Sequence, residues 1–337
     1  MKQLLYILSA LLLIGCGQSA KPAKSQSKQI NKADFSADSA YQYIAAQTAF
    51  GPRTIGSDAH RQCVDYLANQ LQCFGAEIEL QTGEMPDYAG NIVPVTNIIG
   101  RYNPDASQRI LLAAHYDSRP WADHDSDPDK HRSPIDGAND GASGVGVLLE
   151  IARQMQTAKT KIGLDIVFFD AEDMGAPEFY TGKEKENDWC LGSQLWADRH
   201  KSRVESRESR DESPTANYRF GIVLDMVGAG DAVFPYEYFS MQYAAEYVRQ
   251  IWQTAAQLGY GRYFTTNVSY PITDDHYYVN TIANIPCVDI IHYVNPQGYG
   301  DSGFCQSWHT ASDNMSVINH NTLDAVGTTV MTFLIGN

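Results

Sequence analysis

Short, almost uninterrupted apolar runs constrain the fold of this 337-residue chain more than any other feature. The run 164–169 has only Asp165 as a polar intrusion, and the runs 221–226 and 285–292 have the same character. Runs of this length are typical of strands that are buried on both faces of a parallel sheet. Segments with helical spacing of apolar residues separate them. The sequence therefore predicts an α/β fold with a mostly parallel central sheet and helices on both faces.

The remaining elements follow from periodicity and from capping residues. Ser36 and Ser57 are placed to cap two helices, and Gly75 is placed to end the second of them. The stretch 200–217 is charged, rich in serine and without periodicity, which predicts a solvated insertion loop. Residues 34–337 are expected to form one folded domain. Its other predicted strands are 78–80, 96–101 and 110–114, and its other predicted helices are one after Asp140 and those at 191–200, 242–258 and 321–334.

The first residues have the pattern of an export signal. A short basic start is followed by the apolar run 4–14, which has the length of a signal-peptide core and is too short to span a bilayer. It ends in Leu13-Ile14-Gly15-Cys16, which looks like a bacterial lipobox. We therefore expect removal of residues 1–15, a lipid anchor on Cys16, a flexible tether at 16–33 and a place in the bacterial cell envelope, facing the periplasm. An ordinary secretory signal with an incidental cysteine is the alternative.

Composition narrows the class of protein. The formal net charge of −15 argues against a nucleic-acid partner, because such a surface repels phosphate. The hydrophobic content of 43% is that of a soluble globular chain. No Cys-x-x-Cys motif occurs, so a zinc site built from thiolates is not expected.

Acids and histidines follow the predicted strands. Because the carboxyl ends of parallel strands meet at one edge of a sheet, these side chains are expected to gather there. Clustered carboxylates repel one another and are costly to bury, and a divalent cation removes that cost. Carboxylate oxygen and imidazole nitrogen together suit catalytic zinc. The residues concerned are His115, Asp117, Asp140, Asp170, Glu172, Asp173, Asp225, Asp274, Asp275, His276 and His309.

Taken together, these motifs carry a resemblance. The segments 115–117, 139–141, 168–173, 224–228 and 308–310 resemble those of the zinc aminopeptidases and of the glutaminyl cyclases that share their fold, over nearly the whole chain from Phe35. The resemblance implies a zinc aminopeptidase-like fold. It implies Asp140, Asp173 and His309 as zinc ligands and Glu172 as the general acid and base. Asp173 departs from the glutamate that animal cyclases have at this position.

Each of these residues also has a plain structural interpretation. Asp140 could cap the helix that follows it, and His309 could be a core histidine bonded to the backbone. Glu172 could belong to a salt bridge in a loop, and Trp308 could be ordinary core packing. The resemblance nevertheless implies that Trp308 forms an apolar wall for a glutamine-sized side chain. It also suggests a cis peptide bond between Asp140 and Gly141.

The two enzyme classes differ in their metal count. Two-zinc aminopeptidases bind a second ion through the positions of His115 and Asp225, both of which are present, and Asp117 lies beside the first of them. The cyclase resemblance implies instead that Asp274 hydrogen-bonds Asp225, and a proton shared by the two would discourage a second ion. The expectation is therefore one zinc per chain in a monomeric glutaminyl cyclase acting on peptides with an N-terminal glutamine. An aminopeptidase and a non-catalytic lipoprotein are the alternatives.

The resemblance implies a mechanism without a water nucleophile. The α-amine of the substrate attacks its own γ-amide carbon, which is polarised by zinc. Glu172 accepts a proton from the amine and returns it to the departing ammonia, while Asp225 and Asp274 steady the developing charge.

Overall fold

The computed structural model describes residues 31–156, 162–208, 217–297 and 302–336. The predicted leader, the lipobox cysteine Cys16 and most of the predicted tether at 16–33 lie outside these residues. None of the helices in the part of the chain that is described has the length and apolar character needed to cross a membrane.

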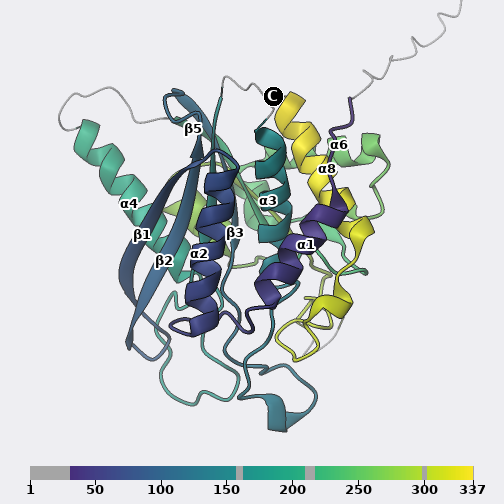
Figure 1. Cartoon of the computed structure of the whole chain (residues 1–337). Coiled ribbons are helices and arrows are strands. Elements are labelled where there is room, and N and C mark those ends of the chain that lie inside the picture. The colour runs from purple at the N-terminus through teal and green to yellow at the C-terminus, as the bar shows by residue number, and fades with distance from the viewer. Residues whose placement is uncertain (1–30, 157–161, 209–216, 298–301, 337) are drawn as a thin grey trace, which may run out of the picture.

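A six-stranded sheet in the order β1-β2-β4-β3-β5-β8 forms the centre of the molecule (Figure 1). Four neighbouring strands are parallel: β4 (Gly163–Phe169), β3 (Gln108–His115), β5 (Asn217–Asp225) and β8 (Cys287–Ile291). The hairpin of β1 (Glu77–Pro86) and β2 (Ile92–Tyr102) joins β4 by antiparallel pairing. The predicted α/β fold with a mostly parallel sheet is confirmed.

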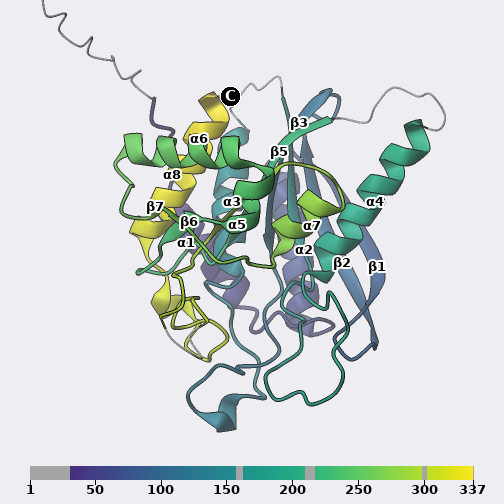
Figure 2. The ribbon, with the colours of Figure 1, turned by 180° about the vertical axis from the view of Figure 1, so that it is seen from behind.

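Helices cover both faces of the sheet. The face seen in Figure 1 carries α1 (Ala37–Thr48), α2 (Asp58–Cys73), α3 (Ala142–Met155) and α8 (His320–Gly336), with α6 (Ala245–Leu258) packed against α8. Figure 2 shows α4 (Leu191–Glu208), α5 (Tyr238–Tyr243) and α7 (Asp275–Thr281) on the opposite face. A separate pair of short strands, β6 (Phe234–Tyr236) and β7 (Phe264–Val268), and the 3₁₀ helices η1 (Pro128–Lys130) and η2 (Met315–Val317) complete the elements.

Alternation along the strands divides the core in two. Leu112 of β3 and Ile166 of β4 are paired in register and pack under α1, α2, α3 and α8. Their neighbours Leu111 and Val167 point to the other face, where they join a smaller cluster that includes Trp196 of α4. Successive side chains of a strand point to opposite faces, and both faces are covered here. This is why the central strands appear in the sequence as continuous apolar runs.

Helix capping follows the predictions, whereas two helix boundaries differ. The side chains of Ser36 and Ser57 accept backbone hydrogens of α1 and α2, and Gly75 ends α2 with a positive φ of 91°.

The predicted insertion loop at 200–217 is wrong for 200–208, because α4 continues to Glu208. This last part of α4 lies mostly in solvent, so it needs no apolar periodicity, and Arg203 reaches Glu79 of β1 at 3.1 Å. Residues 209–216 lie outside the described chain.

The predicted helix at 242–258 is two helices. Ala244 leaves the helical conformation with φ −136°, so that α5 ends at Tyr243 and α6 begins at Ala245.

The carboxyl ends of β3, β4, β5 and β8 meet at one edge of the sheet, and the predicted site residues follow those ends in the sequence.

Candidate active site

The three predicted zinc ligands come together from three separate loops. Asp140 precedes α3, Asp173 follows β4, and His309 follows β8. His309 Nε2 lies 3.1 Å from Asp173 Oδ1 and 3.8 Å from Asp140 Oδ2. All three side chains are buried, and their ligand atoms lie within 4.8 Å of one another. The structure therefore assembles the predicted trio.

The chemistry of this trio fits a divalent cation. Asp140 Oδ2 and Asp173 Oδ2 are buried and have no hydrogen-bond partner in the described chain. Burial and the neighbouring charge of Asp140 raise the pKa of Asp173 well above its ordinary value, so the pair is costly without a cation. Burial lowers the pKa of His309 well below its ordinary value, which keeps the ring neutral and able to bind a metal. Carboxylate oxygen and imidazole nitrogen are both ligands that zinc takes in proteins, so the trio offers zinc suitable donors.

The ligand Asp140 is held through its backbone. Asp313 Oδ1 accepts the amide hydrogen of Asn139 at 2.8 Å, and Oδ2 accepts that of Asp140 at 3.1 Å. Asn139 Oδ1 in turn accepts the amide hydrogens of Gly228 and Ala229 in the loop after β5. The peptide bond between Asp140 and Gly141 is cis, as expected.

Arg53 joins two loops of the site from the N-terminal segment. Its guanidinium is fully buried and donates to the carbonyl oxygens of Tyr116 at 2.8 Å, Asp136 at 2.6 Å and Gly137 at 2.8 Å. The first carbonyl lies just after β3, and the other two lie in the loop that leads to Asp140. The segment Phe50-Gly51-Pro52-Arg53 therefore acts as structural support for the loops that carry the ligands.

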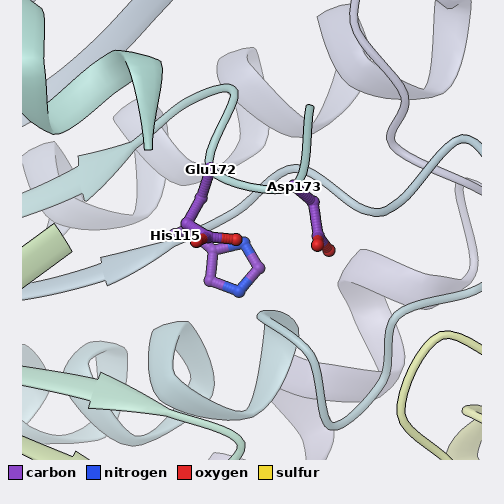
Figure 3. Close-up of side chains that lie close together, drawn as sticks. All are labelled: His115, Glu172 and Asp173. Carbon is purple, nitrogen blue, oxygen red and sulfur yellow. The ribbon is translucent and has the colours of Figure 1, made fainter. Parts of the chain in front are cut away.

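Glu172 and Asp173 project from one loop toward the ring of His115 (Figure 3). Burial, with the charges of Asp173 and Asp274 behind it, raises the pKa of Glu172 well above its ordinary value. Glu172 Oε1 lies 3.1 Å from the thiol sulfur of Cys190, and Glu172 lines the central cavity. Such a carboxyl group can hold a proton and give it back, as the predicted role requires.

Asp117 supports the loop that carries Glu172 and Asp173. It does not belong to the groups of described side chains whose donor atoms lie close enough together to hold a metal ion. Its Oδ1 accepts the amide hydrogen of Glu172 at 3.1 Å, and its Oδ2 accepts that of Asp173 at 3.2 Å. Oδ1 also lies 3.4 Å from Nδ1 of His115. These contacts give Asp117 a supporting position under the loop that carries Glu172 and Asp173.

His115 lies between two carboxylates. Its Nε2 is 3.0 Å from Asp140 Oδ1 and 3.2 Å from Asp225 Oδ1. Burial alone would lower the pKa of His115, but hydrogen bonds to Asp117, Asp140 and Asp225 raise it well above its ordinary value. Burial and the nearby charges of Asp140 and Asp274 raise the pKa of Asp225 to about 7. The residues expected for a second ion are thus present, and here they bind one another.

The expected hydrogen bond between Asp225 and Asp274 stays a prediction. Asp225 Oδ1 lies 3.2 Å from Nε2 of His115, whereas Asp274 belongs to a group of buried donor atoms with His276 and Asp289. Burial raises the pKa of both Asp274 and Asp289, and the charge of Asp274 adds to the effect on Asp289. The charge of Asp274 also contributes to the raised pKa of Asp225.

Behind Asp274 lies a buried ionic group. His276 Nδ1 is 3.4 Å from Asp289 Oδ2, and His276 Nε2 is 2.8 Å from Glu237 Oε2. Glu237 also accepts the amide hydrogens of Phe239 and Ser240 at the start of α5. Sequence reasoning missed Asp289, because it lies inside an apolar run that predicts only a buried strand.

A cavity of about 480 Å³ opens over these groups. Trp308, the predicted wall, lines it and stacks on His309 with ring centroids 3.7 Å apart. Other aromatic and apolar walls of the cavity were not predicted, since no motif marks them. They are Trp189, Tyr278, Tyr293, Phe304, Met226 and Ile272.

Trp189 and an ion pair support the ligands from behind. The ring of Trp189 lies parallel to that of His309, with centroids 5.9 Å apart, and the Arg119 guanidinium lies 4.7 Å from the Trp189 ring. Arg119 binds Asp123 and donates to the backbone oxygen of Asp173 at 3.1 Å. Asp123 Oδ1 is 3.7 Å from His309 Nδ1, where metal-bound histidines commonly have a carboxylate. Sequence reasoning missed Arg119 and Asp123.

The sequence also matches a known protein family over most of its length. The sequence model described as "Peptidase family M28" matches residues 97–334. The chain belongs to peptidase family M28. Solved members of the same fold include zinc-dependent enzymes, in agreement with the oxygen and nitrogen donor set found here.

Three solved structures are similar over nearly the whole chain. A glutaminyl cyclase from Tannerella forsythia is 48% identical, with a TM-score of 0.82, covering 90% of this chain and 100% of its own. A glutaminyl cyclase from Bacteroides thetaiotaomicron is 44% identical, with a TM-score of 0.83, covering 91% and 100%. A zinc-dependent exopeptidase from Parabacteroides distasonis is 48% identical, with a TM-score of 0.83 and the same coverage. The resemblance to bacterial glutaminyl cyclases of the zinc peptidase fold is confirmed.

Proposed function

We propose that this M28 chain is a glutaminyl-peptide cyclotransferase that holds one zinc ion through Asp140, Asp173 and His309. It closes the N-terminal glutamine of a peptide into pyroglutamate and releases ammonia. The likeness to two bacterial glutaminyl cyclases at 44% and 48% identity carries the activity. The metal count rests on the resemblance to the cyclases, and elemental analysis tests it, because His115, Asp140 and Asp225 form a second group of buried donor atoms within 4.8 Å of one another.

The zinc, when bound, supplies a Lewis acid that polarises the γ-amide carbonyl of the substrate. The protein contributes position and proton transfer. In the proposed reaction the α-amine nitrogen forms a bond to the amide carbon, and the bond from that carbon to the amide nitrogen breaks. Glu172 takes the proton that the amine loses and delivers it to the leaving nitrogen, so one ammonia departs. The amine and the amide belong to the same glutamine residue, so the reaction is intramolecular once the substrate is bound in a conformation that brings the two groups together.

The walls of the cavity offer apolar surface to a glutamine-sized side chain. Trp308 and Phe304 form one aromatic side with ring centroids 4.6 Å apart, and Trp189 stands beside His309. Aromatic rings at these positions can pack against the methylene groups of a bound glutamine. Asp225 and Asp274 line the same cavity, where they are proposed to balance the charge that develops as Glu172 changes protonation.

The aminopeptidase alternative has an observation in its favour, since an exopeptidase is among the similar structures. Incubation with a peptide that begins with glutamine and a matched one that begins with leucine distinguishes the two. A cyclase gives an unchanged chain length, one ammonia and a blocked N-terminus from the first peptide and leaves the second intact. Release of free leucine or free glutamine as the main product would overturn the proposal.

We further propose that Cys16 carries a lipid, and that the domain is a monomer facing the periplasm at the end of the tether. The lipobox-like segment and the polar stretch after it support this placement. Labelling of whole cells with a fatty-acid probe tests it: wild type should be labelled and found in membranes, and Cys16→Ala should lose the label. An unlabelled wild-type protein would contradict the lipid anchor.

A further inference from the structure

One side chain touches the carboxylate of Glu172 without a role in the reaction just described. Cys190 lies at the end of the loop that leads into α4, and its thiol sulfur is 3.1 Å from Glu172 Oε1. Cys190 is fully buried. Burial raises the pKa of its thiol well above the ordinary value, with the charge of Glu172 adding to the effect. The sulfur therefore keeps its hydrogen and is the donor in this contact.

The backbone holds the thiol in this position. The amide of Cys190 donates to the carbonyl oxygen of Glu172 at 3.0 Å, and the amide of Leu191 donates to that of Ala171 at 3.0 Å. These two hydrogen bonds join the loop after β4 to the start of α4. Cys190 has a positive φ of 58°, a conformation that few residues other than glycine adopt. The contact between Cys190 and Glu172 is thus fixed at the backbone as well as at the side chain.

Because the thiol binds Oε1, the carboxylate of Glu172 cannot rotate freely about its last bond. Among the described contacts, the thiol is the side chain that hydrogen-bonds this carboxylate, and Glu172 also lines the cavity. We propose that Cys190 is a positioning residue, whose thiol orients the Glu172 carboxylate so that its other oxygen faces the substrate amine. This inference rests on the proposed cyclase function. A thiol is a weak donor, so it can orient the group without competing strongly for the proton that Glu172 must carry.

The test compares variants at Cys190 with wild type under steady-state conditions. Cys190→Ala should lower kcat about tenfold, the loss expected for one hydrogen bond to a catalytic carboxylate, with KM within twofold and zinc content unchanged. Cys190→Ser keeps a donor of similar size and should recover most of kcat. Cys63→Ala is the matched control, because Cys63 is also fully buried but packs in the core cluster under α1 and α2. It should keep the wild-type kcat.

A spectroscopic readout separates orientation from packing. The infrared difference spectrum between wild type and Cys190→Ser isolates the S–H stretch of Cys190, which a hydrogen bond shifts to lower frequency. Glu172→Leu removes the acceptor and should move this band to higher frequency. Wild-type kcat in Cys190→Ala, an equal loss in Cys63→Ala, no recovery in Cys190→Ser, or a band that Glu172→Leu leaves in place would each overturn the inference. If the wild-type enzyme itself forms no pyroglutamate, the function has failed instead.

Discussion

Asp117 Oδ2 lies 3.2 Å from the backbone nitrogen of Asp173 and accepts its hydrogen, while Oδ1 does the same for Glu172. One carboxylate thus fixes the backbone of a predicted zinc ligand and of the predicted proton carrier. We expect Asp117→Asn to disturb both, because the amide group turns one acceptor into a donor that faces an N–H group. Zinc affinity and kcat should each fall about 10- to 100-fold. Metal titration and initial rates measure the two effects, with the exposed Asp105→Asn as control.

Glu172→Gln should abolish cyclisation while zinc stays bound. The change removes a proton acceptor and keeps the size of the side chain, so at least about a hundredfold loss of kcat is expected. Elemental analysis of the same sample should show wild-type zinc, whereas Asp140→Ala and His309→Ala should lose metal and activity together. Substantial activity in Glu172→Gln would mean that another group carries the proton.

Metal content should be one zinc per chain. The resemblance to the cyclases carries this expectation, and the test is needed because His115, Asp140 and Asp225 bring a second group of buried donor atoms within 4.8 Å of one another. Protein stripped by a chelator should be inactive, and one equivalent of zinc should restore full activity. Two tightly bound ions in elemental analysis would favour the peptidase alternative.

Cyclase activity should rise between about pH 6 and pH 8. The attacking group is the free α-amine of the substrate, whose pKa is roughly 7.7–8.0, so its reactive form grows over this range. Rates measured with a substrate whose amine has a lower pKa should reach their plateau at a correspondingly lower pH. A profile that does not move with the substrate amine would contradict amine attack.

Glu237 should make stability depend on pH in the acid range. Although burial opposes it, His276 and the amides of Ser240 and Phe239 lower the pKa of Glu237 below its ordinary 4.5. A carboxyl group whose folded pKa is depressed contributes stability above its unfolded pKa and loses it as the pH falls through the folded pKa. Glu237→Gln should therefore be less stable than wild type at pH 7, by about 1.5–3 kcal/mol, the size of a hydrogen bond to a charged group.

The difference in the free energy of unfolding between wild type and Glu237→Gln should shrink as the pH is lowered below about 4.5, where wild type loses the contribution of the ionised carboxylate. Urea unfolding at pH 7 and at several acid pH values measures it. A difference that stays constant with pH would show that Glu237 acts through packing alone.

The parts of this structure that could be predicted are those that depend on local pattern. The run 164–169 identifies β4 because a strand covered on both faces has no polar side to show. Asp140, Asp173 and His309 are among the acids and histidines expected at the strand ends, the family resemblance selects them as a set, and the structure brings them together. Their roles in zinc binding and catalysis remain predictions.

The contacts that could not be predicted join segments far apart in the chain. Asp289 looked like an isolated intrusion in an apolar strand, and only the pairing of β5 with β8 places it behind Asp274. The thiol of Cys190 meets Glu172 through two loop hydrogen bonds that no periodicity reveals. The end of α4 could not be predicted for a different reason: this part of the helix is exposed to solvent, so its sequence has no stripe of apolar residues at helical spacing.

The three carbonyl contacts of Arg53 carry a consequence for the assembly of the enzyme. Arg53 precedes every strand of the sheet, and His309 follows every strand, so the site needs both ends of the domain in place. A chain shortened past Arg53 or past His309 would still contain every strand of the sheet, but we expect it to lose the ion. Metal uptake should therefore require a chain that has been made and folded at least from Arg53 to His309.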